Sequence, residues 1–222
     1  MRWGRLLLLL LWPVFAAGAL APASKSHAVT FGTATQVDWF VGSSEENSLK
    51  LKVRPLYVDG KLKEFTTGEA RDITDRAFVV RRVYRVNDRL PTDTKQMSKW
   101  KWQRAGWLLV DRPTGRVTEL RLPDLDPFYS AASWYRDYVA YCGVSGDPAK
   151  LYAIVAQVGV KKLLVRKELG RAHGADMPDS ECDAPSWQRQ PVRVTFTPKE
   201  GQPVTFAIHR SSAEVSPEEP EE

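Results

Sequence analysis

Three aspartates bracket an aromatic segment in the middle of the chain and form the nearest approach to a catalytic set. Asp124 and Asp126 precede residues 127–136, and Asp137 follows them. Glycosidases need two carboxylates at a set separation, and sugar sites commonly add aromatic platforms. The segment therefore predicts, as one alternative, a carbohydrate-active hydrolase. The competing interpretation is that the first two aspartates cap turns and that Asp137 pairs with Arg136 or another surface arginine.

Aromatic residues are the second group that could bind a ligand. Trp100 and Trp102 are two residues apart, so on a strand their side chains share one face. Together with Trp134, Tyr135 and Asp137 they are the candidate ligand-binding residues. If these side chains are exposed, they form a stacking platform for a glycan or a peptide. If they are buried, they are large core residues of a small β-protein, and this is the interpretation we favour.

Several common chemistries lack the residues they require. The chain has three histidines, and only His173 and His209 remain if the N-terminal segment is removed. The sequence contains no Gly-x-Ser-x-Gly elbow for a serine nucleophile and no His-Glu-x-x-His zinc motif. It also contains no glycine-rich phosphate loop, no Cys-x-x-Cys pair and no EF-type calcium loop. We therefore expect no metal site and no cofactor.

Cys142 and Cys182 are the two cysteines of the chain. In an oxidising compartment an isolated pair predicts a disulfide, and closing a loop of this length stabilises the fold by roughly 4 kcal/mol in the chain-entropy model. Cys142 lies in an apolar run, whereas Cys182 lies in a polar, proline-flanked loop. A bond between them would hold that loop in place. The alternative is two separate free thiols.

The first residues have the layout of a secretory signal peptide. Two arginines are followed by six consecutive leucines and then by small residues. The apolar run is shorter than the about 20 residues of a membrane span. We expect residues 1–28 to be removed after Ala28, with Ala23 as the other possible cut, leaving no stable membrane span. An uncleaved membrane anchor is the alternative.

The other end of the chain is acidic and rich in proline, so we expect residues 213–222 to be a disordered tail. Removal of residues 1–28 takes away Arg2, Arg5 and Lys25 and lowers the formal net charge from +5 to +2. Basic residues are spread along the rest of the chain, and no nucleic-acid-binding motif is present. We therefore expect no nucleic acid partner.

Residues 29–212 carry the signals of one all-β domain. Asp59-Gly60 is a strong two-residue hairpin signal, because both turn positions need φ > 0. Apolar residues alternate or run in short blocks between Gly/Pro turns, and no helix of three turns with caps is present. The pattern predicts antiparallel hairpins and meanders in a sandwich-like or partial propeller-like sheet. The expected strands are 49–58, 61–66, 77–86, 107–110, 116–120, 138–144, 151–158, 163–166, 192–196 and 204–208.

The hairpin Val110-Asp111-Arg112-Pro113-Thr114-Gly115-Arg116-Val117 resembles the outer hairpin of many β-propeller blades. Residues 132–169 also look like a blade, with three consecutive strands and a Gly-Asp turn. This local resemblance over 107–169 implies propeller-like sheet packing there. No repeat of about 40 residues recurs with the marks of a propeller, so a closed propeller is not expected. The chain as a whole resembles exported bacterial all-β proteins, a likeness that implies no activity.

Together these features predict a non-catalytic exported β-module that binds an unknown ligand or has a structural role. We expect it in the periplasm or outside the cell. A glycan or a peptide is the expected kind of ligand. The hydrolase with Asp124, Asp126 or Asp137 is the second hypothesis, and exposure of the tryptophans is the observation that discriminates best between a binding surface and a core.

Overall fold

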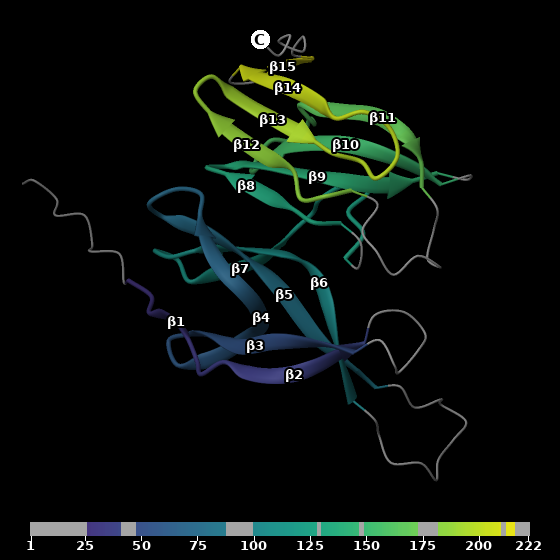
Figure 1. Ribbon diagram of the computed structural model, residues 1–222. Helices are drawn as coiled ribbons and strands as arrows, with labels where there is room; N and C mark the ends of the chain where they lie inside the picture. The colour runs from purple at the N-terminus through teal and green to yellow at the C-terminus, as the bar shows by residue number, and fades with distance from the viewer. Residues whose placement is uncertain are drawn as a thin grey trace, which may run out of the picture.

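The computed structural model describes an all-β protein built as one domain, as the sequence predicts. The described residues form fifteen β-strands and no helix. Among these residues there is accordingly no helix long and apolar enough to cross a membrane. Figure 1 shows one sheet at the bottom of the view and two further sheets stacked above it. The described residues are 26–40, 48–87, 100–127, 130–146, 149–172, 182–209 and 212–215.

The first sheet contains seven strands from the N-terminal half. A hydrogen-bonded path runs β3–β2–β6–β5–β4, and the additional pairing of β4 with β3 closes it into a ring. Closure leaves fewer free strand edges, the usual site of unwanted pairing. The strands are β1 (Val29–Phe31), β2 (Thr35–Phe40), β3 (Ser48–Val58), β4 (Lys61–Asp72), β5 (Ala77–Asn87), β6 (Trp100–Asp111) and β7 (Arg116–Leu120).

The pairing between β2 and β6 is the shortest in the ring. β2 and β6 are parallel and pair through Trp39 and Trp102, while the other pairings of this sheet are antiparallel. A buried cluster from β3, β5 and β6 forms one core of the sheet, with residues of β1, β4 and β7 packed on it. The cluster comprises Leu56, Phe78, Val80, Leu108 and Val110.

The turn between β3 and β4 is the one that the Asp59-Gly60 signal predicts. Asp59 has φ of 51° and Gly60 has φ of 72°, so both central residues are left-handed. The turn also binds the two residues that precede β1, His27 and Ala28. The Asp59 backbone N–H donates to the Ala28 carbonyl at 2.9 Å, and the Asp59 carboxylate accepts from the Ala28 N–H at 3.0 Å. The His27 ring nitrogen Nδ1 lies 2.7 Å from that carboxylate.

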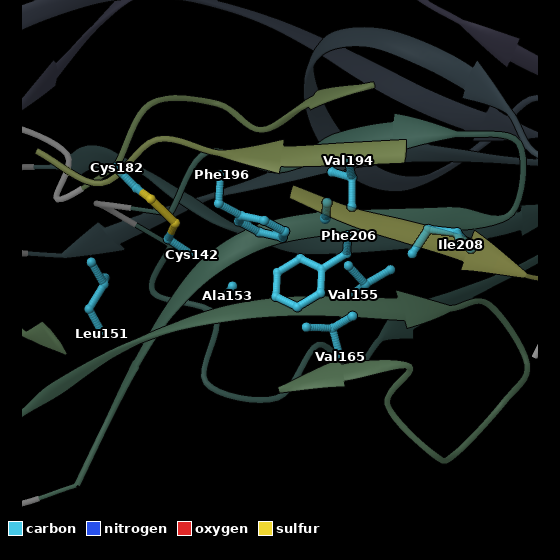
Figure 2. Close-up of a cluster of buried hydrophobic side chains, with 11 residues drawn as sticks. Cys142, Leu151, Ala153, Val155, Val165, Cys182, Val194, Phe196, Phe206 and Ile208 are labelled. Atoms are coloured by element: carbon cyan, nitrogen blue, oxygen red, sulfur yellow. A yellow bond between two sulfur atoms is a disulfide. The ribbon is translucent and has the colours of Figure 1, made fainter. Parts of the chain in front are cut away.

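The C-terminal half forms two four-stranded antiparallel sheets that share one core. One sheet has the order β11–β10–β9–β8 and the other β12–β13–β14–β15. Figure 2 shows Phe196 and Phe206 between the two sheets, with Val155 and Val165 beneath them. This packing is a sandwich. The strands are β8 (Ser133–Tyr135), β9 (Tyr138–Ser145), β10 (Lys150–Gln157), β11 (Val165–Arg171), β12 (Ser186–Arg189), β13 (Val192–Phe196), β14 (Val204–His209) and β15 (Ser212–Val215).

The expected disulfide is present and lies at one end of this core. Cys142 on β9 is bonded to Cys182, which precedes β12, and their Cα atoms are 6.2 Å apart. Both cysteines belong to the buried cluster. Cys182 also forms an isolated antiparallel β-bridge with Pro198. The disulfide therefore attaches the segment that leads into β12 to β9 in the second sheet.

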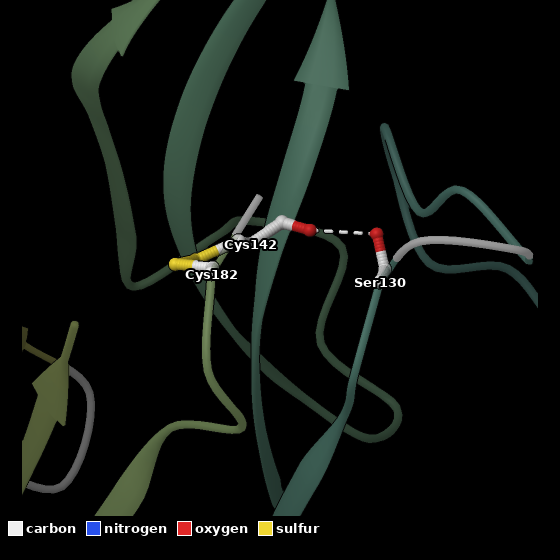
Figure 3. Close-up of a disulfide and its surroundings, with 3 residues drawn as sticks. All are labelled: Ser130, Cys142 and Cys182. Carbon is white, nitrogen blue, oxygen red and sulfur yellow. Dashed lines mark hydrogen bonds between the residues drawn. A yellow bond between two sulfur atoms is a disulfide. The ribbon is translucent and has the colours of Figure 1, made fainter. Parts of the chain in front are cut away.

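The described residues of the connection between the first and second sheets are 121–127 and 130–132, and Leu122, Leu125 and Ala132 pack against the outer face of β9 and β10. The Tyr141 hydroxyl donates to the Pro123 carbonyl at 2.7 Å, and burial raises the pKa of this phenol. The Ser130 hydroxyl, which is buried, donates to the Cys142 carbonyl at 2.6 Å (Figure 3). These bonds hold the connection against the sandwich on both sides of Leu125.

Three expectations need correction or comment. Residues 213–215, expected to be part of a tail, belong to β15, which pairs with Phe206–His209 of β14. Residues 216–222 lie outside the described residues. The third apolar strand begins at Val165 instead of residue 163. The propeller-like segment 107–169 is divided between two sheets, because β6 and β7 pair in the first and β8–β11 form the second.

Replacing Gly60 with valine should lower the free energy of unfolding by roughly 1–2 kcal/mol, because a β-branched residue is strained at positive φ. No atom lies within 4 Å of a Cβ built at Gly60, so the effect is one of the backbone alone. Urea unfolding measures it. Gly60→Asn is the control and should lose less, since asparagine tolerates this conformation. Equal stability of the valine variant and the wild type would show that the turn is not left-handed.

Candidate functional site

The main candidate site is a cavity of about 570 Å³ between the first sheet and the start of the second. Its volume lies in the range of small-molecule sites. Four strands of the first sheet, the residues leading into β8, and one residue before β12 contribute to its walls. The lining residues are Leu51, Thr67, Gly68, Glu69, Arg71, Arg81, Arg104, Trp107, Ala131, Ala132, Ser133, Trp134 and Ala184.

Strand register places the key side chains of the floor side by side. Arg81 on β5 lies opposite Thr67 on β4 and opposite Trp107 on β6. Directly opposed residues of antiparallel strands project from the same face. The register shifts beside this row, between Thr67 and Arg71 and between Arg81 and Val83, and Gly68 has φ of 68°. Bulges of this kind re-aim side chains and are common next to functional sites.

Arg81 is the most unusual residue of the cavity, because a long charged side chain is rarely buried without a carboxylate partner. Its exposed fraction is 5%. One guanidinium nitrogen donates to the Pro127 carbonyl at 2.8 Å, and the group lies 5.6 Å from the centre of the Trp107 ring. Its Nε–H has no acceptor. The arginine is therefore held in place by a neutral oxygen and a ring face.

A second arginine lines the same cavity. The Arg104 guanidinium lies 4.6 Å from the centre of the Trp39 ring, and it makes no ion pair with any described carboxylate. Burial lowers the pKa of Arg81 to about 10, and repulsion by Arg104 contributes in the same direction, while Asp126 opposes it. Burial also lowers the pKa of Arg104. Both groups stay charged at neutral pH, so the cavity concentrates positive charge.

Two indoles form the wall beside Arg81. The rings of Trp107 and Trp134 meet edge to face, with centroids 5.1 Å apart. The Nε1–H groups of both rings are buried and have no acceptor. Buried N–H groups normally find a partner, and the Nε1–H groups of Trp39 and Trp187, which do not line this cavity, lack one as well among the described residues. The cavity lining thus combines aromatic surface, two arginines without an ion pair and three N–H donors without an acceptor in the described part of the chain.

A second cavity of about 390 Å³ lies over the connection between the sheets. Its walls are mostly aliphatic, with Leu122, Val139 and Leu163 among them, and its charged lining residues are Arg121 and Lys161. It lacks aromatic rings and buried unmatched donors among the described residues. We therefore regard the arginine-containing cavity as the better candidate.

The structure divides the sequence-predicted binding residues between three places. Trp134 lines the cavity. The Tyr135 ring stacks on Trp187 with centroids 5.6 Å apart, away from Trp134 along the same strand, and the Asp137 carboxylate accepts from Gln157 at 2.8 Å. These three residues therefore form no single platform, either with one another or with Trp100 and Trp102.

Trp100 and Trp102 lie at the other end of β6 from the cavity. Trp102 is five residues from Trp107, about 16 Å along an extended strand. Trp100 is 57% exposed, and Arg85 lies against both rings, 5.6 Å from one centroid and 5.4 Å from the other. Trp102 also packs edge-on against Phe65. The favoured burial of this pair is thus wrong for Trp100 and holds in part for Trp102.

The carboxylates of the hydrolase hypothesis have structural partners. Asp124 accepts two hydrogen bonds from the Arg166 guanidinium at 3.1 and 3.2 Å. Its backbone carbonyl accepts from the Val144 N–H at 2.9 Å. Ser130 bonds the backbone of Asp126 on both sides. In the two cavities described, Glu69 is the single carboxylate of the lining, and no three potential metal ligands gather among the described residues.

Sequence reasoning missed the two residues that define the site. Arg81 stands within the run Ala77–Asn87, where the arginines are typical of a solvated strand face. The signal that could have found it is the pattern Val79, Val80, Arg81, in which a cation follows directly on an apolar run expected to be buried. The sequence around Arg104 carries no comparable pattern, because the partial burial of this side chain depends on the closure of the sheet.

Comparisons with protein-family models, with curated proteins and with solved structures each found no match. The resemblance of residues 107–169 to propeller blades is therefore not confirmed. The function has to be inferred from the geometry of the site.

Replacing Arg104 with methionine should leave the free energy of unfolding unchanged or raise it by up to about 1 kcal/mol, because it removes a desolvated charge that repels Arg81. Arg82→Met is the matched control. Arg82 pairs with Glu64 at 3.1 Å and with Glu119 at 3.5 Å, so its loss should cost about 0.5–1 kcal/mol. Thermal and urea unfolding compare the two. A larger loss for Arg104→Met than for Arg82→Met would show that Arg104 stabilises the fold.

Proposed function

We propose that this chain is an exported, non-catalytic binding protein and that it holds a glycan in the cavity between its first and second sheets. The observation that carries the proposal is the row of Arg81, Trp107 and Trp134, which lines a cavity of ligand size and whose Nε–H and Nε1–H groups have no acceptor among the described residues of the protein. Sugars offer many oxygen acceptors and an apolar ring face, which suit unmatched donors beside indoles.

A compact ligand fits the surroundings better than an extended peptide. Peptides often bind by adding a strand to a free sheet edge. Near the cavity, β4 is paired on both sides, with β3 and with β5. The outer edge of β8 faces β12, where Tyr135 stacks on Trp187. The described strands around the cavity thus offer little edge for a peptide, which favours a sugar unit.

The engagement of the aspartates supports binding over hydrolysis. A glycosidase needs one carboxyl group as acid and a second as nucleophile or base, both facing the same bond. Asp124 is held by Arg166 and Asp137 is held by Gln157. Asp126 acts on the charge of Arg81, and none of the three aspartates lines the cavity. Glu69 stands at its rim beside Arg71, 3.8 Å from the guanidinium. A single rim carboxylate does not make the required pair.

Export is the proposed setting, and the disulfide is compatible with a periplasmic or extracellular protein. Residues 1–25 lie outside the described part of the chain. The contacts of His27 and Ala28 with Asp59 favour a signal cut after Ala23, because a cut after Ala28 would remove the acceptor of the Asp59 N–H. The cavity does not depend on which cut is used.

Binding can be tested with three probes: cellotriose as a neutral sugar, trigalacturonate as an acidic sugar, and trialanine as a peptide. Isothermal titration calorimetry should detect a sugar and not the peptide. Ala131→Trp should abolish binding by filling the cavity, whereas Trp100→Ala, outside it, should bind as the wild type does. Circular dichroism checks that both variants are folded. Failure of both sugars to bind the wild type, or full binding by folded Ala131→Trp, would refute the proposal.

The intact mass of protein recovered from the exported fraction tests the setting. Under non-reducing conditions we expect a chain that begins at Ser24 or Val29 and is two hydrogens lighter than its reduced form. The second feature follows from the bond between Cys142 and Cys182. A chain that retains residues 1–23, or one whose mass does not rise on reduction, would contradict export with signal removal or the disulfide, respectively.

A further inference from the structure

The cavity contains more positive charge than its own walls neutralise. Arg81 and Arg104 both line it; Arg81 donates to the Pro127 carbonyl and Arg104 lies over the Trp39 ring. Arg71, the third arginine, is close to Glu69, but both of these side chains are largely exposed. A half-buried cation beside a buried one is unfavourable unless an opposite charge joins them. A bound anion would supply that charge.

The state of Arg81 adds a second, independent reason. It is 95% buried, because its exposed fraction is 5%, and yet its Nε–H remains without an acceptor. The single hydrogen bond of its guanidinium goes to the Pro127 carbonyl. Two indole N–H donors lie in the same wall. The nearby Asp126 partly offsets the charge of Arg81. Neutral hydroxyl groups could accept from these donors but would add no further negative charge.

We propose that the cavity recognises the carboxylate of an acidic sugar, a uronic acid, through Arg81 and Arg104, with the indoles of Trp107 and Trp134 beside the sugar ring. This inference rests on the proposed glycan-binding function and names its ligand class. A carboxylate is planar and accepts several hydrogen bonds, which matches the fork of donors on a guanidinium. The ring of the sugar gives the indoles an apolar surface to contact.

The lowered pKa values of the two arginines agree with this assignment. Burial and mutual repulsion lower the pKa of Arg81, and burial lowers that of Arg104. An anion bound between them would oppose both causes and raise both pKa values. By linkage, an anion that raises the arginine pKa values binds more tightly to the protonated guanidinium groups than to the deprotonated ones.

The decisive comparison uses trigalacturonate and its fully methyl-esterified form, which has the same rings without the charge. Calorimetry on the wild type should give an affinity for the acid at least about tenfold higher than for the ester, the range expected for a charge-assisted hydrogen bond. Arg104→Gln should remove this preference. Arg189→Gln, which removes a charge from an exposed residue of β12 outside the cavity, should keep it.

Arg104→Gln is chosen as the main variant because Arg104 makes no hydrogen bond or ion pair that folding needs, whereas Arg81 holds the Pro127 carbonyl. Equal affinity of the wild type for acid and ester would overturn the carboxylate assignment while leaving glycan binding intact. Binding of neither form would overturn the assignment, and a failure of cellotriose to bind as well would overturn the proposed function. An acid preference that persists in Arg104→Gln, or binding of trialanine in place of the sugar acid, would also overturn the assignment.

Discussion

The Arg81 guanidinium is the interaction on which the junction between the two halves depends. It leaves the first sheet from the middle of β5, is almost fully buried, and donates to the carbonyl of Pro127 in the connection to the second sheet. A buried cation needs its hydrogen bonds satisfied, so the connection cannot move away without leaving the guanidinium unpaired. The same residue forms part of the cavity, so the position of the connection and the charge of the site are coupled.

The rest of the architecture holds that connection in place from the other side. The backbone of Asp124 accepts from β9, Tyr141 reaches back to Pro123, and Ser130 is bonded to the carbonyl of Cys142. The disulfide then ties Cys142 to the segment that leads into β12. Residues that line the cavity, from Ala131 to Trp134 and at Ala184, follow directly on these fixed points. A binding site between two packed sheets gains affinity when its lining residues are already held in place, because binding then costs less conformational entropy.

Much of the fold follows from local sequence signals. The Asp59-Gly60 hairpin, the alternating strand pairs and the disulfide are each specified by a few neighbouring residues, and the structure contains them. The first and second strands were not predicted, because their edges are defined by pairing with β3 and β6. Such long-range pairing has no local signature.

The candidate site shows the same limit more strongly. The sequence could mark Trp134 as a candidate binding residue, because a tryptophan in a small β-protein is usually either a core residue or a stacking platform. Arg81 and Arg104 look like ordinary residues of solvated strands, but in the closed sheet beside the sandwich Arg81 is buried and Arg104 is half-buried. Tyr135 and Asp137 were grouped with Trp134 by proximity in sequence. Neighbours on a strand point to opposite faces, and the structure separates Tyr135 from Trp134 accordingly.

The most direct measurement of the central claim is the nuclear magnetic resonance spectrum of the side-chain N–H groups during titration with trigalacturonate. The account predicts that the Nε–H signals of Arg81 and Arg104 and the Nε1–H signals of Trp107 and Trp134 shift together with a single dissociation constant. The Nε1–H signal of exposed Trp100 should stay in place. Movement of the Trp100 signal alone, with the four cavity signals unchanged at saturation, would contradict a binding site between the two sheets.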